Sequence, residues 1–115
     1  MTPHFTRREM QCPCGCALAP TQAFMDRLEA LRVALGRPLH VNSGARCPKH
    51  NALVKGAANS YHIQGIAADV ACLTGELRYD LMREALRLGF MGIGVNATFV
   101  HLDIRPGRPT MWLYG

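Results

Sequence analysis

The sequence predicts an α+β domain in which helices pack against a small, mostly antiparallel sheet. Two segments, residues 21–35 and 75–88, repeat apolar side chains at the three- and four-residue spacing of an amphipathic helix. Short apolar runs of strand length lie between and after them, separated by turn-forming residues. No internal repeat or linker divides the 115 residues, so we expect residues 1–115 to form one domain.

The first half of the chain yields one long helix, one strand and one short helix. The long helix is expected over residues 21–35 and should end at Gly36, because glycine readily adopts the left-handed conformation that follows a helix. Residues 38–43 have the pattern of a short strand. A second, shorter helix is expected to begin at Pro48, since proline suits the first helical turn, and to run to about Lys55.

The second half is richer in strands. Residues 56–65 are rich in turn formers and lead into a buried strand at residues 66–71. Thr74 can cap the helix over residues 75–88. The remaining strands are expected at residues 91–95, 99–104 and 110–114, the last of them at a sheet edge. Gly92 and Gly94 are expected to allow close packing near a site.

The net charge and hydropathy pattern narrow the class of partner. The formal charge of +5 is compatible with a soluble surface of scattered arginines and with attraction to an anionic partner, either a nucleic acid or a cell-wall polymer. The arginines are scattered and form no recognisable nucleic-acid module, so we expect no nucleic-acid partner. We also expect no membrane partner and no signal peptide, because no apolar run reaches roughly 18 residues and the first ten residues are polar.

Five cysteines are present, three of them within residues 12–16. An odd number in a chain without an expected signal peptide argues against a complete disulfide framework. The single residue between neighbours differs from the roughly two to four residues found in common zinc knuckles. A tight loop of small residues, a second metal site and a bridge from Cys12, Cys14 or Cys16 to Cys47 are all compatible with this pattern.

The strand at residues 99–104 separates an apolar face from a polar one, because alternate side chains point in opposite directions. The polar face continues to residue 105 and carries His101, Asp103 and Arg105. An ordinary solvated strand face would look similar. His101 by itself therefore identifies no site.

Asp69 lies in the otherwise apolar strand at residues 66–71. An ionised carboxylate is costly in such a strand unless it is paired, hydrogen-bonded or bound to a metal. A salt bridge to one of the many arginines would satisfy it, and so would a metal ion. His62 lies seven residues upstream, across a turn at Gly65 that can fold the imidazole back toward Asp69.

Taken together, His62, Asp69 and His101 supply two imidazoles and one carboxylate. This is a sufficient ligand set for a catalytic Zn²⁺ with a fourth position left for water. Zinc activates such a water and polarises a carbonyl group, which is the chemistry of amide hydrolysis. The combination predicts a zinc hydrolase.

The run Ser60-x-His62-x-x-Gly65-x-Ala67-x-Asp69, followed by a strand bearing His101, resembles the zinc D-Ala-D-Ala carboxypeptidase family. That family belongs to the peptidase group named for lysostaphin, D-Ala-D-Ala metallopeptidases and sonic hedgehog. The likeness extends from about residue 24 to residue 112. The short form of the chain is similar to phage and prophage members of the family. It implies a hedgehog/D-Ala-D-Ala-peptidase-like fold and hydrolysis of peptidoglycan stem peptides, by a carboxypeptidase or an endopeptidase cut.

The resemblance also implies roles for single residues. The residues that match zinc ligands are His62, Asp69 and His101. Arg46 matches an arginine that holds a substrate carboxylate, a task suited to a bidentate guanidinium, and Ser60 matches a serine near that carboxylate. The structural alternatives are an ion pair at a helix terminus or the surface for Arg46 and a turn-forming hydroxyl for Ser60.

The general base is the point at which the sequence departs from the family. The acidic residue often found three positions before the last histidine ligand is Thr98 here, which cannot act as a base near neutral pH. Asp103 is the best replacement because it shares a strand face with His101. Asp103 is equally suited to orienting a ligand or to being a ligand itself. Lys55 also stands where the family usually has a glycine.

Two other functions are compatible with the sequence. Thr98 favours a zinc-binding module of the cell wall that lacks catalysis, and a basic structural protein of a phage particle would need no metal. Our main expectation is a monomeric zinc metallopeptidase. We expect it to be made in the cytoplasm and to act in the periplasm or at the cell wall after release. His40 and His50 are expected to have structural or surface roles.

Overall fold

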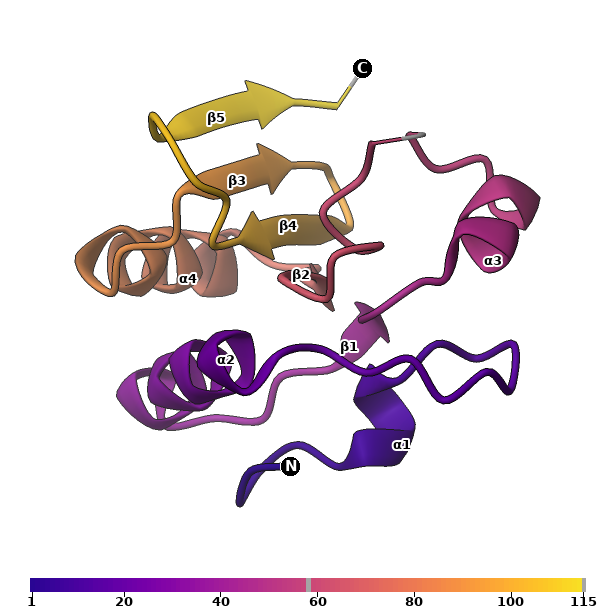
Figure 1. Ribbon diagram of the computed structural model, residues 1–115. Helices are drawn as coiled ribbons and strands as arrows, with labels where there is room; N and C mark the ends of the chain where they lie inside the picture. The colour runs from indigo at the N-terminus through magenta and orange to yellow at the C-terminus, as the bar shows by residue number, and fades with distance from the viewer. Residues whose placement is uncertain (58, 115) are drawn as a thin grey trace.

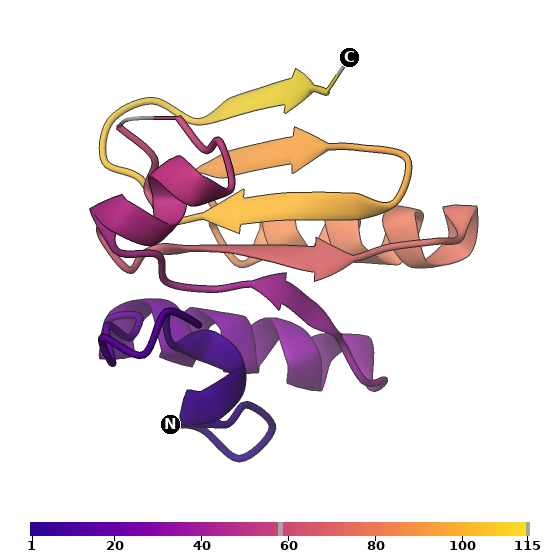
Figure 2. The ribbon, with the colours of Figure 1, turned by 90° about the vertical axis from the view of Figure 1, so that its right-hand side faces the viewer.

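Two long helices cover one face of a five-stranded sheet (Figure 1), and a shorter helix with its following loop lies near one end of the opposite face (Figure 2). The structure is a computed structural model and describes residues 1–57 and 59–114. The helices are α1 (Arg7–Met10), α2 (Gln22–Leu35), α3 (Pro48–Leu53) and α4 (Gly75–Arg87). The strands are β1 (Val41–Ser43), β2 (Ala67–Ala71), β3 (Gly92–Val95), β4 (Phe99–Asp103) and β5 (Thr110–Leu113).

The strand order is β1-β2-β4-β3-β5, and all neighbouring pairs but one are antiparallel. The exception is β5, which pairs parallel to β3. Strand β4 ends at Asp103, opposite the start of β3 at Gly92, and residues 104–109 need only step across this end of the sheet. The Thr110 amide then donates to the Met91 carbonyl, so β5 begins level with β3 and runs beside it. The predicted α+β class and mostly antiparallel sheet are confirmed.

The two predicted long helices are present, with α2 beginning one residue later and α4 ending one residue earlier than expected. The Thr21 hydroxyl accepts from the Phe24 amide at the start of α2, and Gly36 adopts a φ of 64° after its end. The Thr74 hydroxyl accepts in the same way from the Leu77 amide at the start of α4. Each hydroxyl satisfies one of the amides that the first helical turn leaves without a partner.

The core lies between these helices and the sheet. Helix α2 buries one apolar face, and the strands contribute every second residue to the same layer. The fully buried members from α2, β2 and β4 are Phe24, Met25, Leu28, Leu31, Ala68, Val70, Val100 and Leu102. Because strand side chains alternate, the residues between them, including Asp69 and His101, face the opposite side of the sheet. The core thereby fixes which side chains reach the candidate site.

Several predicted boundaries needed correction. The first strand was expected from residue 38 but begins at Val41, and its pairing with β2 has an irregularity in the register. Helix α3 ends at Leu53 instead of continuing to Lys55, because Lys55 adopts a φ of 57° that no α-helix accommodates. Helix α1 was not predicted; Thr6 and Glu9 form a reciprocal capping box at its start. None of the helices in the described residues is long and apolar enough to cross a membrane.

Candidate metal centre

Asp69 and His101 are brought together by the pairing of β2 with β4. The two residues are direct cross-strand partners in this antiparallel ladder, and both point away from the helical layer. The His101 Nδ1 atom lies 3.0 Å from Asp69 Oδ1. Both side chains are largely buried, with 8% of the His101 side chain and 15% of the Asp69 side chain exposed.

His62 reaches the same carboxylate from the turn before β2. The His62 amide donates to the Ser60 hydroxyl, and its carbonyl accepts from the Gly65 amide. Gly65 has a φ of 72°, so this position favours a glycine. The turn places His62 Nε2 3.3 Å from Asp69 Oδ1, as the spacing across Gly65 predicts.

The remaining nitrogen of each imidazole is held by an acceptor. His62 Nδ1 lies 2.7 Å from the Gly44 carbonyl oxygen, and His101 Nε2 lies 2.7 Å from Asp103 Oδ2. A carbonyl and a carboxylate can only accept, so in the neutral rings these nitrogens carry the hydrogens. The lone pairs of His62 Nε2 and His101 Nδ1 are then free to bind a metal, which is how metal-binding histidines are usually fixed.

The spacing of these donors fits a small divalent ion. One donor atom from each of His62, Asp69 and His101 lies within 4.8 Å of the other two. Tetrahedral zinc with bonds of about 2.0–2.1 Å separates its ligand atoms by about 3.3 Å. The distances of 3.0 and 3.3 Å to Asp69 Oδ1 are close to this value. The group that the sequence predicts is therefore assembled, with donors suited to zinc.

The charge states of this group depend on its internal contacts. Burial alone would raise the pKa of Asp69, but hydrogen bonds and charges from His101 and His62 hold that pKa well below its ordinary value. Burial would likewise lower the pKa of His101, but hydrogen bonds to Asp103 and Asp69 raise it instead. Without a metal, these contacts favour the protonated form of His101, in which each ring N–H faces one carboxylate.

Arg46 lies against the other oxygen of the same carboxylate. Its Nη2 donates to Asp69 Oδ2 at 3.1 Å, Nε donates to the Ser43 hydroxyl and Nη1 donates to the Asn51 side chain. Only 12% of the side chain is exposed, so this is a mostly buried ion pair and not a surface one. The salt bridge expected for Asp69 is therefore present at Oδ2, while Oδ1 faces the two imidazoles and is placed to bind a metal.

Asp103 approaches the group from behind His101. It is fully buried, and both of its oxygens are occupied: Oδ2 contacts His101 Nε2, and Arg105 contacts both oxygens through its side chain and donates its amide to Oδ1. These contacts keep the pKa of Asp103 well below its ordinary value despite burial. Gly92 makes room for the carboxylate, because a Cβ there would lie only 2.2 Å from Asp103 Oδ1.

This position matches the orienting role that the sequence left open for Asp103. Asp103 is not among the residues that line the adjoining cavity, and it reaches the metal group through the His101 ring. The base role stays a prediction without a direct contact to the cavity. Thr98 lies at the exposed turn, where its hydroxyl donates to the Asn96 side chain. Among the described lining residues, Asp69 is the one carboxylate.

A cavity of about 560 Å³ opens onto the three candidate metal ligands, His62, Asp69 and His101. Its wall carries three cationic side chains, Arg46, Lys55 and Arg105, and Ser60 lies beside them. Ser60 serves the turn by accepting from the His62 amide, and its role near a substrate carboxylate stays a prediction. His50 lines a different cavity and His40 is exposed, so neither joins the metal group.

Sequence reasoning missed the aromatic wall of this cavity. Its members are Tyr61, Phe99, Trp112 and Tyr114. The Arg105 guanidinium lies 4.7 Å from the Tyr61 ring and 4.8 Å from the Trp112 ring, which extends the wall. Trp112 and Tyr114 alternate along the last predicted strand, and that alternation was the available signal. Their direction depends on how β5 pairs with β3, which the sequence does not reveal.

The comparisons with known proteins agree with this geometry. A family model described as Peptidase M15 matches residues 3–103, which is most of the chain. The matched range contains the three candidate metal ligands and Arg46, and it ends at Asp103. No curated protein matches the chain closely enough to count as a relative.

Proposed function

Since the chain belongs to the Peptidase M15 family, we propose that it is a zinc-dependent metallopeptidase that hydrolyses the stem peptides of peptidoglycan. The observation that carries the proposal is the convergence of two imidazole lone pairs and one carboxylate oxygen at the wall of a cationic cavity. The substrate class is supported by the sequence resemblance and by this charge, which suits peptides with free carboxylates.

Zinc is the proposed ion because two imidazoles and one carboxylate form a common catalytic zinc set. His62, Asp69 and His101 would hold it. When bound, the ion supplies a Lewis acid that activates water and polarises the scissile carbonyl.

Arg46 is the proposed anchor for a substrate carboxylate. Its guanidinium has five N–H groups, and the contacts to Ser43, Asn51 and Asp69 use three nitrogens but leave an N–H free on each terminal nitrogen. A carboxylate held there would lie next to Asp69, so the neighbouring peptide bond would be presented to the metal group. Such an arrangement favours cleavage near a free carboxyl terminus.

Asp103 is proposed as a positioning residue. By accepting from His101 Nε2 it keeps the hydrogen on that nitrogen and leaves Nδ1 as the donor toward the metal. Arg105 in turn fixes the Asp103 carboxylate from two sides and stacks against Tyr61 and Trp112. The ligand geometry and the aromatic wall are thereby linked through one guanidinium.

The test is digestion of purified stem peptides by zinc-loaded protein, with products identified by mass spectrometry. We expect loss of one or more residues from peptides that end in a free carboxylate, and none after treatment with a chelator. His62→Ala and Asp69→Ala should each abolish cleavage, while His40→Ala, which changes an exposed histidine outside the group, should leave it unchanged. Amidating the peptide terminus separates a carboxypeptidase cut from an endopeptidase cut.

A second candidate, a zinc-binding module of the cell wall without catalysis, is favoured by one observation. The cavity wall described here carries no carboxylate besides Asp69, so the usual type of general base is missing from it. This candidate predicts that the protein holds zinc and binds cell-wall peptides but releases no product. Unchanged peptides after prolonged incubation with fully loaded protein would favour it over the peptidase.

The proposal extends to the setting in which the protein works. We infer a monomer that has neither a nucleic-acid nor a membrane partner and that acts in the periplasm or at the cell wall after release from the cytoplasm. Sedimentation analysis of the zinc-loaded protein and assays of binding to purified cell walls and to duplex DNA would test these points. Tight DNA binding at physiological salt would contradict them.

A further inference from the structure

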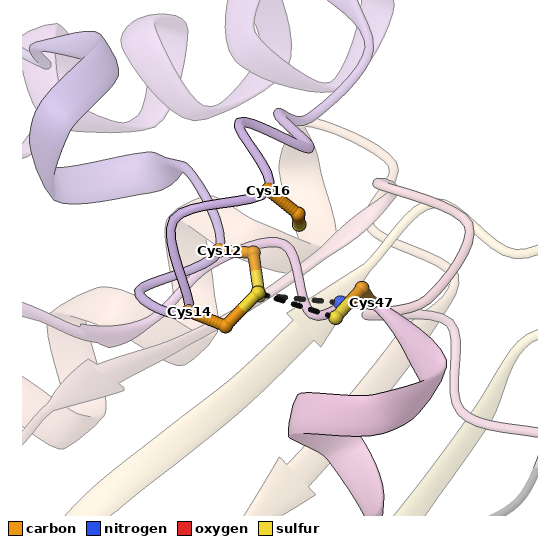
Figure 3. A group of neighbouring side chains, drawn as sticks. All are labelled: Cys12, Cys14, Cys16 and Cys47. Carbon is orange, nitrogen blue, oxygen red and sulfur yellow. Dashed lines mark hydrogen bonds between the residues drawn. The ribbon is translucent and has the colours of Figure 1, made fainter.

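A second group of potential metal ligands lies outside the cavity. It consists of Cys12, Cys14, Cys16 and Cys47, none of which lines the cavity beside His62. Figure 3 shows the first three side chains coming from one loop and meeting Cys47 at the start of α3. We propose that these four thiolates bind one structural zinc ion.

The sulfur positions fit a tetrahedral site. The Sγ atoms of the four residues all lie within 4.8 Å of one another, and the separations Cys12–Cys14 and Cys14–Cys47 are 3.4 Å. Zinc–sulfur bonds of about 2.3 Å in a tetrahedron place sulfur atoms about 3.8 Å apart. All four thiols are free, although a bridge to Cys47 was one of the possibilities the sequence allowed. Four converging sulfurs match the ligand set of structural zinc.

Backbone amides support the sulfur atoms. The Cys47 amide donates to Cys12 Sγ at 3.3 Å, and the His50 amide donates to Cys47 Sγ at 3.4 Å. Amide donors of this kind stabilise thiolates and orient them toward a cation.

The loop that carries the first three cysteines has few other means of being held in place. It is closed by a hydrogen bond from the Cys12 amide to the Leu18 carbonyl, and Arg7 Nη2 donates to the Ala17 carbonyl at 3.1 Å. Gly15 and Ala17 both have positive φ angles. Cys14 and Cys16 are exposed, so burial of their side chains contributes little to the order of the loop. A metal cross-link would supply the stability that this small apolar contact area does not.

The proposed ion would also brace the metal centre of the proposed peptidase. The Ala45 amide donates to the Met10 carbonyl, so the segment before the cysteine loop lies directly against the segment that precedes Cys47. That second segment supplies the Gly44 carbonyl to His62 and carries Arg46, which contacts Asp69. Joining the two segments through zinc would fix the positions of both contacts.

The test measures zinc per chain by mass spectrometry in the reduced full-length protein after removal of free metal. We expect two zinc ions per chain. Cys14→Ala and Cys47→Ala should each retain one zinc ion, and so should His62→Ala. A variant that combines a cysteine substitution with His62→Ala should retain none. Cys72→Ala is the matched control, because Cys72 is buried away from the group and should leave both ions in place.

Cobalt substitution of the unmodified protein keeps the test decisive if a cysteine variant fails to fold. We expect the intense sulfur-to-cobalt charge-transfer absorption of a tetrathiolate site, and it should persist in His62→Ala. A single zinc ion that His62→Ala removes, or no charge-transfer absorption in the cobalt form, would overturn the proposal. Because cysteine-bound metal is measured without substrate, failure of the peptidase assay would leave this result unaffected.

Discussion

The imidazole of His101 lies between two carboxylates, with Nε2 2.7 Å from Asp103 and Nδ1 3.0 Å from Asp69. The buried Asp103 fixes the ring, and the partly exposed Asp69 lines the cavity together with His101. His101 of β4 thus connects the buried Asp103, which orients its ring, to Asp69, which lines the cavity.

Replacing Asp103 with asparagine tests its positioning role. The amide can present its NH₂ group to His101 Nε2 and favour the wrong tautomer, so we expect zinc affinity to fall by roughly 10–100-fold, as is typical for such outer partners. Chelator competition measures this affinity, and Asp80→Asn on the exposed face of α4 is the control. Unchanged zinc affinity together with abolished hydrolysis would instead identify Asp103 as the base.

Replacing Arg46 with lysine keeps the charge but removes the bidentate geometry. We expect KM for peptides with a free carboxyl terminus to rise by roughly 10–100-fold, since hydrogen bonds to charged groups contribute about 1.5–3 kcal/mol. The same variant should change KM little for peptides whose terminus is amidated. Steady-state kinetics on both peptide forms, with Arg37→Lys at an exposed position as the control, measures the difference. Equal effects on both peptides would remove Arg46 from carboxylate recognition.

Gly92 is predicted to be intolerant of a side chain. An added methyl group would meet Asp103 Oδ1 at 2.2 Å, so Gly92→Ala should push the carboxylate away from His101. We expect a loss of about 1–3 kcal/mol in the free energy of unfolding, the usual cost of overpacking, with weaker zinc binding. Gly75→Ala is the matched control because open space surrounds that position. Chemical denaturation of both variants provides the comparison, and equal stabilities would contradict the packing argument.

The stability of the metal-free protein should depend on pH through His101. Its pKa in the folded protein is raised above the ordinary value of 6.5, so its contribution to stability is complete below that value and is lost as the pH rises through the folded pKa. The melting temperature of the metal-free protein should therefore fall as the pH is raised from about 6 to 8. Asp69 and Asp103 have lowered pKa values and stay ionised throughout this range.

The zinc-loaded protein should respond in the opposite direction. Protons compete with the metal for His101 Nδ1, so acidification should release the metal and lower the melting temperature. Thermal melts of both forms across the same pH series test this pair of expectations. A His101→Asn variant should lose the slope of the metal-free form. A melting temperature of the unmodified metal-free protein that rises with pH would show that other groups control its stability.

The sequence was sufficient to predict that His62, Asp69 and His101 meet at one place, because their signals are local. Asp69 stands out as a charge in an apolar strand, and His101 follows from the alternation of β4. The turn at Gly65 indicated how His62 could return to the same place. Gly36 and Thr74 likewise marked ends of the long helices, because helix capping depends on nearby atoms.

Other features depend on contacts between distant segments and could not be derived in that way. The role of Asp103 depends on the occupation of both its oxygens, and the cavity wall depends on the pairing of β5 with β3. The meeting of Cys47 with the cysteine loop requires the packing of Ala45 against Met10. Each of these contacts is set by tertiary packing and not by the conformational preferences of neighbouring residues.

The division of the Asp69 carboxylate between the imidazoles and Arg46 has a thermodynamic consequence. A metal ion beside Asp69 Oδ1 would offset part of the negative charge that Asp69 presents to the Arg46 guanidinium at Oδ2. Arg46 would then attract an anion more strongly in the metal-loaded protein. By reciprocity, an anion captured by Arg46 would tighten the hold on the cation by the same factor. Loading and recognition would then reinforce each other through two oxygens of a single side chain.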